Sequence, residues 1–134
     1  MSGLIQRLWD RRGWRLLELR AAERAHLQGL QLLVENLSLI QRDQLKLFNY
    51  FDVVGGDTGT HYRIHFDDRM NVEQFDPGGK ATRRLCFLPR GRLPVGDVML
   101  AQKIALELFE NDALRKANQL LAWEMYCPPF NFRY

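Results

Sequence analysis

The chain has 134 residues, of which 46% are hydrophobic and 26% charged, and its formal net charge is +3. This composition is typical of one folded domain with a hydrophobic core and argues against disorder, while the mild positive charge permits an acidic partner without requiring one. Two cysteines are too few for a disulfide scaffold, and no apolar run approaches the ~20 residues of a membrane span. Because the first residues also lack a signal-peptide core, we expect a cytoplasmic protein with reduced thiols.

The stretch from about residue 14 to residue 48 has the hydrophobic period of a helix. Its leucines recur at steps of three and four, as at Leu16, Leu19, Leu30, Leu33 and Leu37. A single helix this long exceeds what a domain of this size needs. The pattern therefore predicts either a split near Gly13 or Gly29, or a part that packs against something outside the chain. Gly29 either marks a break or lets another element approach closely.

The next stretch, from residue 51 to residue 88, has a period of two, which is typical of strands with one buried face. Strands are expected at 51–54, 61–66, 70–75 and 82–88, separated by the glycine-rich segments 55–59 and 76–79. Connections this short cannot be parallel crossovers, so the pattern predicts a three- or four-stranded antiparallel meander.

The last stretch predicts helices and then a tail. Asp97 is the expected N-cap of a helix, Asn111 and Asp112 mark a break, and a second helix carries Leu120 and Leu121. The predicted fold is α+β: a long N-terminal helix, the antiparallel meander, and C-terminal helices packed on one sheet face. We expect one domain over residues 1–122, with 1–13 as a possible docking segment, and an extended aromatic and proline-containing tail over 123–134.

One string matches a catalytic motif, the Asp-Thr-Gly of aspartic proteases at Asp57-Thr58-Gly59. That chemistry needs two carboxylates sharing a proton, so a single copy would have to act in a homodimer. The preferred interpretation is a glycine-rich loop in which Asp57 bonds its own backbone, and a dimeric hydrolase at Asp57 is the least favoured alternative. No serine lies in a nucleophile elbow, so no catalytic residue is assigned and the sequence favours a protein that is not an enzyme.

The sequence predicts neither a metal site nor a cofactor. His61 and His65 lie four positions apart on an expected strand, which separates them by ~13 Å, too far for one zinc ion.

A basic strip could bind nucleic acid. Between residues 80 and 92 the chain has no acidic residue, and arginines can hold phosphates bidentately. The candidate residues are Arg63, Arg83, Arg84, Arg90 and Arg92. The aromatic residues, however, occupy the alternate positions that build a core, so a solvated basic face is preferred and nucleic acid stays the alternative.

The two termini carry the strongest candidates for partner binding. Trp9 and Trp14 lie among arginines and leucines in a segment that either folds back on the domain or docks onto a partner. The tail gathers aromatic residues around two prolines and would expose a large apolar patch in water. Its candidate residues are Trp123, Tyr126, Phe130, Phe132 and Tyr134. The sequence thus predicts a non-enzymatic subunit or adaptor that docks onto another protein, or onto a second copy, within a larger assembly.

Overall fold

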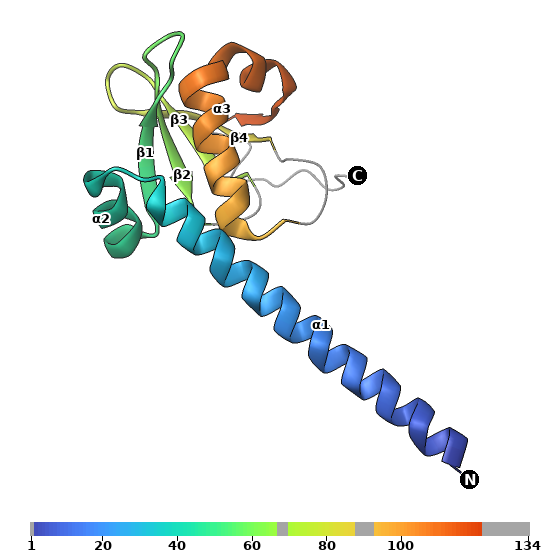
Figure 1. The fold of residues 1–134 in the computed structure, drawn as a ribbon. Coiled ribbons are helices and arrows are strands. Elements are labelled where there is room, and N and C mark those ends of the chain that lie inside the picture. The colour runs from blue at the N-terminus through green and yellow to red at the C-terminus, as the bar shows by residue number, and fades with distance from the viewer. Residues whose placement is uncertain (1, 67–69, 88–92, 122–134) are drawn as a thin grey trace.

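Three helices and five strands make up the computed structural model, which describes residues 2–66, 70–87 and 93–121, with side chains for 17–66, 70–87 and 93–117. The helices are α1 (Ser2–Glu35), α2 (Leu39–Phe48) and α3 (Val95–Lys116). α3 packs on one face of the sheet, α2 lies beside strand β1, and most of α1 extends away from the body (Figure 1). The predicted α+β class is confirmed.

The five strands form one antiparallel sheet in sequence order. They are β1 (Tyr50–Val54), β2 (His61–His65), β3 (Val72–Phe75), β4 (Ala81–Cys86) and β5 (Asn118–Leu121). The meander β1–β4 confirms the predicted strands to within a few residues. β5 was not predicted: the helix expected to carry Leu120 and Leu121 ends at Lys116. Pairing with β4, with Leu85 opposite Gln119, overrides the helical pattern because it gives these backbone groups hydrogen-bond partners.

One side of the sheet carries the core. Alternate residues of β1 and β2, among them Phe51, Val53, Tyr62 and Ile64, are almost fully buried beneath α3. Further core residues come from β3, β4 and the helices: Val72, Leu85, Met99, Leu106, Leu33 and Leu37. The period of two that predicted the strands therefore also identifies their buried face.

α2 closes the free edge of β1 with side chains in place of a neighbouring strand. Gln41 Nε2 donates to the carbonyl oxygen of Asp52 at 2.9 Å, and the Asp52 N–H donates to Gln44 Oε1 at 2.9 Å. An uncovered edge strand would offer these groups to other chains. The two glutamines therefore protect this edge from strand addition.

The break between the first two helices lies at residues 36–38, so the predicted split near Gly13 or Gly29 was wrong. Ser38 caps α2 through a capping box, in which its Oγ accepts from the Gln41 N–H while its own N–H donates to Gln41 Oε1. This reciprocal pair satisfies backbone donors and starts a new helix. α1 instead continues through Gly29.

Gly29 allows the close approach that was its other predicted role. It faces Gly96 at the start of α3, where a Cβ on Gly96 would overlap the Gly29 carbonyl and lie 2.6 Å from the Leu30 nitrogen. The last turns of α1 are thereby pressed onto α3 backbone to backbone.

α3 begins and bends at residues slightly different from those predicted. Pro94 is the N-cap, without a side-chain cap bond, and Asp97 lies in the first turn, where its charge favours the helix dipole. The expected break at Asn111 and Asp112 occurs at Phe109, whose φ of −137° and ψ of 40° leave the helical region.

Candidate interaction surfaces

Most of α1 projects from the domain instead of packing on it. α1 has 34 residues, and every residue from 17 to 28 is exposed. Only its C-terminal end reaches the body, through Gly29 and Leu33 (Figure 1). At 1.5 Å per residue, the part of α1 before Gly29 is roughly 40 Å long.

Apolar residues follow one line along this helix, and we call them the α1 stripe. Over the segment with described side chains, the stripe contains Leu19, Leu27, Leu30 and Val34 at helical steps of three and four, and only Glu23 interrupts it. Leu19 is 64% exposed, Leu27 is 58% exposed and Val34 is 39% exposed. Leu33, which packs on the body, lies on a different side of the helix. The stripe is therefore free to bind another surface.

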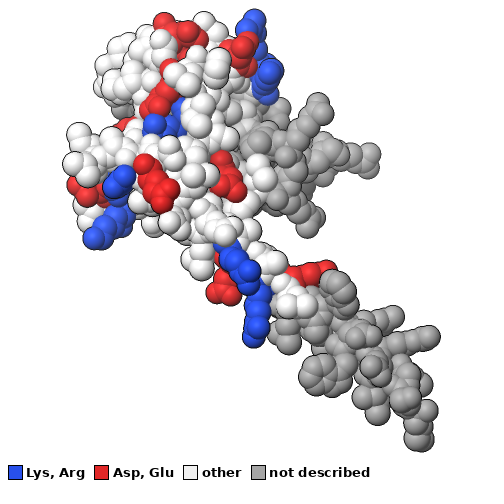
Figure 2. Space-filling model, viewed as in Figure 1, with Lys and Arg blue, Asp and Glu red and all other residues white. Residues whose placement is uncertain are grey.

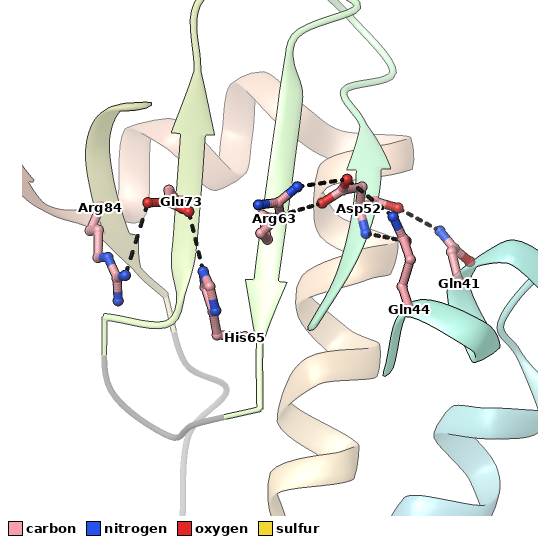
Figure 3. A network of polar contacts seen from close by, with 7 residues as sticks. All are labelled: Gln41, Gln44, Asp52, Arg63, His65, Glu73 and Arg84. Carbon is pink, nitrogen blue, oxygen red and sulfur yellow. Dashed lines mark hydrogen bonds and ion pairs between the residues drawn. The ribbon is translucent and has the colours of Figure 1, made fainter. Parts of the chain in front are cut away.

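The sheet face opposite α3 carries a network of paired charges (Figure 3). Arg63 Nε donates to Asp52 Oδ1 at 2.8 Å and its guanidinium lies 3.9 Å from the centre of the Tyr50 ring. The hydrogen bond to Asp52 raises the pKa of Arg63 and outweighs the opposing effect of burial. On the same face, Glu73 contacts His65 at 3.2 Å and Arg84 at 3.9 Å. These charged groups pair with one another within the chain, and the Arg84 Nε is buried without a hydrogen-bond partner among the described residues.

The structure separates the candidate nucleic-acid residues. Arg63 and Arg84 share the open face, each beside a carboxylate. Arg83 belongs to the helix-covered face, where its Nε donates to Gln74 Oε1 at 2.6 Å. Arg90 and Arg92 lie outside the described residues. Among the described residues on the face seen in Figure 2, Lys and Arg alternate with Asp and Glu in small groups, without a continuous basic area. Nucleic-acid binding stays a prediction that this geometry does not favour.

Asp57, the residue of the protease-like motif, caps a helix segment. Its Oδ2 accepts from the Asn111 N–H at 3.0 Å, just after the kink of α3 at Phe109. The carboxylate thus bonds the backbone of a distant segment, rather than its own as expected. This gives Asp57 a structural role, and the hydrolase alternative gains no support from it.

The same loop surrounds a buried carboxylate, Glu110. Its Oε1 accepts from the backbone N–H groups of Asp57 at 3.1 Å and Thr58 at 2.7 Å, and its Oε2 accepts from the Tyr62 hydroxyl at 2.6 Å. Burial would raise the pKa of Glu110, but these hydrogen bonds outweigh it, and the pKa lies below its usual value. Burial and the bond to Glu110 together raise the pKa of Tyr62.

Two glycines let the loop at residues 55–59 approach α3 closely. A Cβ on Gly55 would overlap the Glu110 carboxylate, and one on Gly56 would overlap the Glu107 carbonyl oxygen. Because the donors fully engage Glu110 and it is buried, we assign it to stability. Its signal in the sequence is weak, since the partners lie about fifty positions away.

A second buried polar pair joins the sheet to α3. Asn71 and Gln102 exchange two amide hydrogen bonds, of 2.7 and 2.8 Å, and Gln102 also donates to the Phe87 carbonyl oxygen at 3.2 Å. Both residues are fully buried. The pair fixes the position of α3 on the sheet. Its side-chain amides bond each other and the backbone, so they are not available to a ligand.

The predicted partner-binding residues fall in two places. The backbone of Trp9 and Trp14 belongs to the projecting part of α1. Trp123, Tyr126, Phe130, Phe132 and Tyr134 lie outside the described residues. Sequence reasoning missed the exposed residues Leu19 and Leu27 as binding candidates, although their spacing of eight was visible.

Comparison with known proteins identifies no relative. No family model matches the chain, and neither a curated protein nor a solved structure shows significant similarity to it. The surfaces of the chain are therefore the basis for any functional proposal.

Two further findings concern the described residues. None of their helices combines the length and the apolar content needed to cross a bilayer. Among the same residues, no three His, Cys, Asp or Glu side chains come together as metal ligands.

Proposed function

We propose that this chain is a non-enzymatic subunit or adaptor that docks through α1 onto a partner chain of a larger assembly. The observation that carries the proposal is the α1 stripe: a helix held to its domain only at one end, with exposed leucines along one line. The body made of the sheet, α2 and α3 would then serve as the support that holds this helix in a fixed direction.

Energetics favour a covered stripe. Burying one leucine side chain stabilises a complex by about 1.5–3 kcal/mol, and in water a helix without tertiary packing is only marginally stable. Leu19 and Leu27 leave most of their surface in water. A partner that covers the stripe would therefore stabilise both the helix and the assembly.

The aromatic tail is the second docking element of the proposal. It rests on the composition of residues 123–134 alone, which combines aromatic side chains with two prolines. Since β5 extends to Leu121, a truncation that tests the tail must end after residue 122, so that the sheet keeps its fifth strand.

Substitution within the stripe tests the proposal. In an extract of its source, we expect the wild-type chain to migrate in a complex well above its own 15.8 kDa. The double variant Leu19→Lys, Leu27→Lys should leave this complex, because two charges on the stripe prevent its burial. The measurement is native size fractionation followed by detection of the chain.

A matched control is available on the same helix. Leu17→Lys, Gln28→Lys introduces the same charges at exposed positions on another side of α1, and it should leave the size of the complex unchanged. If the stripe variant stays in the complex, or if the wild-type chain migrates as a single molecule, docking through the stripe is wrong.

A further inference from the structure

The proposed function leaves the partner open, and the residues of α1 point to a second copy of the same chain. Resting on that proposed function, we infer that α1 pairs in antiparallel orientation with α1 of a second molecule, so that Arg12 of each chain lies against Glu23 of the other.

The first argument is the register of the stripe. Helical spacing continues the stripe toward the N-terminus through positions 16, 12, 9 and 5, occupied by Leu16, Arg12, Trp9 and Ile5. Its charged interruptions are therefore Arg12 and Glu23, and they are equally distant from a midpoint between residues 17 and 18.

An antiparallel pair centred on that midpoint places unlike charges together. Position 12 of one helix faces position 23 of the other, position 16 faces position 19, and position 5 faces position 30. Leu16 is thus opposite Leu19, and Ile5 is opposite Leu30. The Arg12–Glu23 pair occurs twice, because the two-fold symmetry repeats it. A parallel pair would instead place Arg12 beside Arg12 and Glu23 beside Glu23.

The second argument is the charge of the two halves of α1. Residues 2–17 contain four arginines and one aspartate, whereas residues 18–35 contain two arginines and three glutamates. Antiparallel pairing brings the basic half of one helix to the acidic half of the other, and parallel pairing brings the two basic halves together. Charge complementarity of this kind selects orientation in helix pairs.

The third argument is space at the end of the stripe nearest the body. Antiparallel pairing brings the first turns of the second helix to residues 30–34. α3 occupies the side of α1 that carries Gly29 and Leu33, whereas Leu30 is only partly buried and Val34 is 39% exposed. The stripe therefore stays open up to the point where α1 joins the domain.

Charge reversal tests the pairing in the purified full chain. By light scattering, the wild type should have twice the mass of the 15.8 kDa chain at micromolar concentrations. Arg12→Glu and Glu23→Arg should each raise the dimer dissociation constant by roughly tenfold or more, because each places like charges together in both symmetric layers. The combined variant Arg12→Glu, Glu23→Arg restores both pairs and should bring the constant back to within about threefold of wild type.

Arg11→Glu is the control, since it changes the charge by the same amount at a neighbouring position away from the stripe. It should leave the dimer largely intact. Equal weakening by Arg11→Glu and Arg12→Glu would show a general charge effect and overturn the specific pairing.

Cross-linking tests the orientation. In a background with Cys86→Ala and Cys127→Ala, Leu27→Cys alone should form no disulfide dimer, because antiparallel helices place the two positions roughly 28 Å apart. A mixture of Leu27→Cys and Leu8→Cys chains should cross-link readily, because position 27 of one helix faces position 8 of the other in this register. A disulfide dimer of Leu27→Cys by itself would show parallel pairing and overturn the inference.

The outcomes separate this inference from the proposed function. A wild-type chain that is monomeric at all concentrations overturns the self-pairing. If Leu19→Lys, Leu27→Lys still releases that chain from its complex in the extract, docking through α1 stands and the occupant is a different protein. If neither measurement responds, both the pairing and the docking function are wrong.

Discussion

Glu110→Ala should lower the free energy of unfolding by about 3 kcal/mol. The change removes the acceptor of the Asp57 and Thr58 N–H groups and of the Tyr62 and Thr58 hydroxyls, and it takes away the carboxylate partner of the Tyr62 hydroxyl, which is buried. Urea denaturation followed by far-UV circular dichroism measures the loss.

Glu107→Ala is the matched control, one turn earlier on α3. Glu107 contacts Lys103 at 2.7 Å near the surface, and its removal should cost under about 1 kcal/mol. A loss at Glu110 no larger than that at Glu107 would contradict the structural role of the buried carboxylate.

The pH dependence of stability follows from the same residue. Because the pKa of Glu110 is lower in the folded chain than its ordinary value of 4.5, folding favours the ionised form. The resulting stability is fully present above the unfolded pKa and is lost as the pH falls through the folded pKa. The stability advantage of wild type over Glu110→Gln should therefore shrink below about pH 4.5. An advantage that is constant between about pH 6 and pH 3 would contradict the lowered pKa.

Gly96→Ala should lower the free energy of unfolding by about 3 kcal/mol, because the new methyl group would overlap the backbone of α1. The Cβ would meet the Gly29 carbonyl, a rigid group that cannot rotate away as a side-chain end could. Either α1 moves away from α3, which opens the core around Leu33, or the contact is strained. Urea denaturation measures the loss, and the expected direction is a lower midpoint.

Gly78→Ala provides the comparison for this glycine. Its Cβ would lie 3.4 Å from Asp76 Oδ1, an ordinary contact, and the stability should change by less than about 1 kcal/mol. If Gly96→Ala is equally mild, the close crossing of α1 and α3 does not hold the helix to the body.

The sequence was most informative where the pattern is local. Alternation of apolar and polar residues from 61 to 65 predicted both a strand and its buried face, since the period of two reports directly on exposure. Phe66, expected on the same buried face, is 38% exposed. The start of α2 has an equally local signal, since Ser38 and Gln41 form a capping box three positions apart. The break was nevertheless predicted near Gly13 or Gly29, because glycines weaken a helix. For Gly29 the sequence left two alternatives, a helix break or a close approach of another element. Only the packing partner, Gly96, decides between them.

Features made by distant residues could not be predicted. The partners of Glu110 lie 48 to 53 positions away, and nothing near Glu110 in the sequence indicates that it is buried. β5 likewise has the leucine spacing of a helix, and only the free edge of β4 makes it a strand. The docking surfaces were predicted in part: the excess length of α1 was evident, whereas the exposure of Leu19 and Leu27 depends on where the body lies.

Amide hydrogen exchange along residues 17–28, measured on the chain isolated in its native assembly, tests the docking of α1 most directly. If a partner covers the α1 stripe, these amides should exchange on the order of a hundredfold or more slowly than in an unstructured peptide. Fast exchange over 17–28, beside protected amides at core positions such as Ile64, would show an uncovered helix and contradict the account.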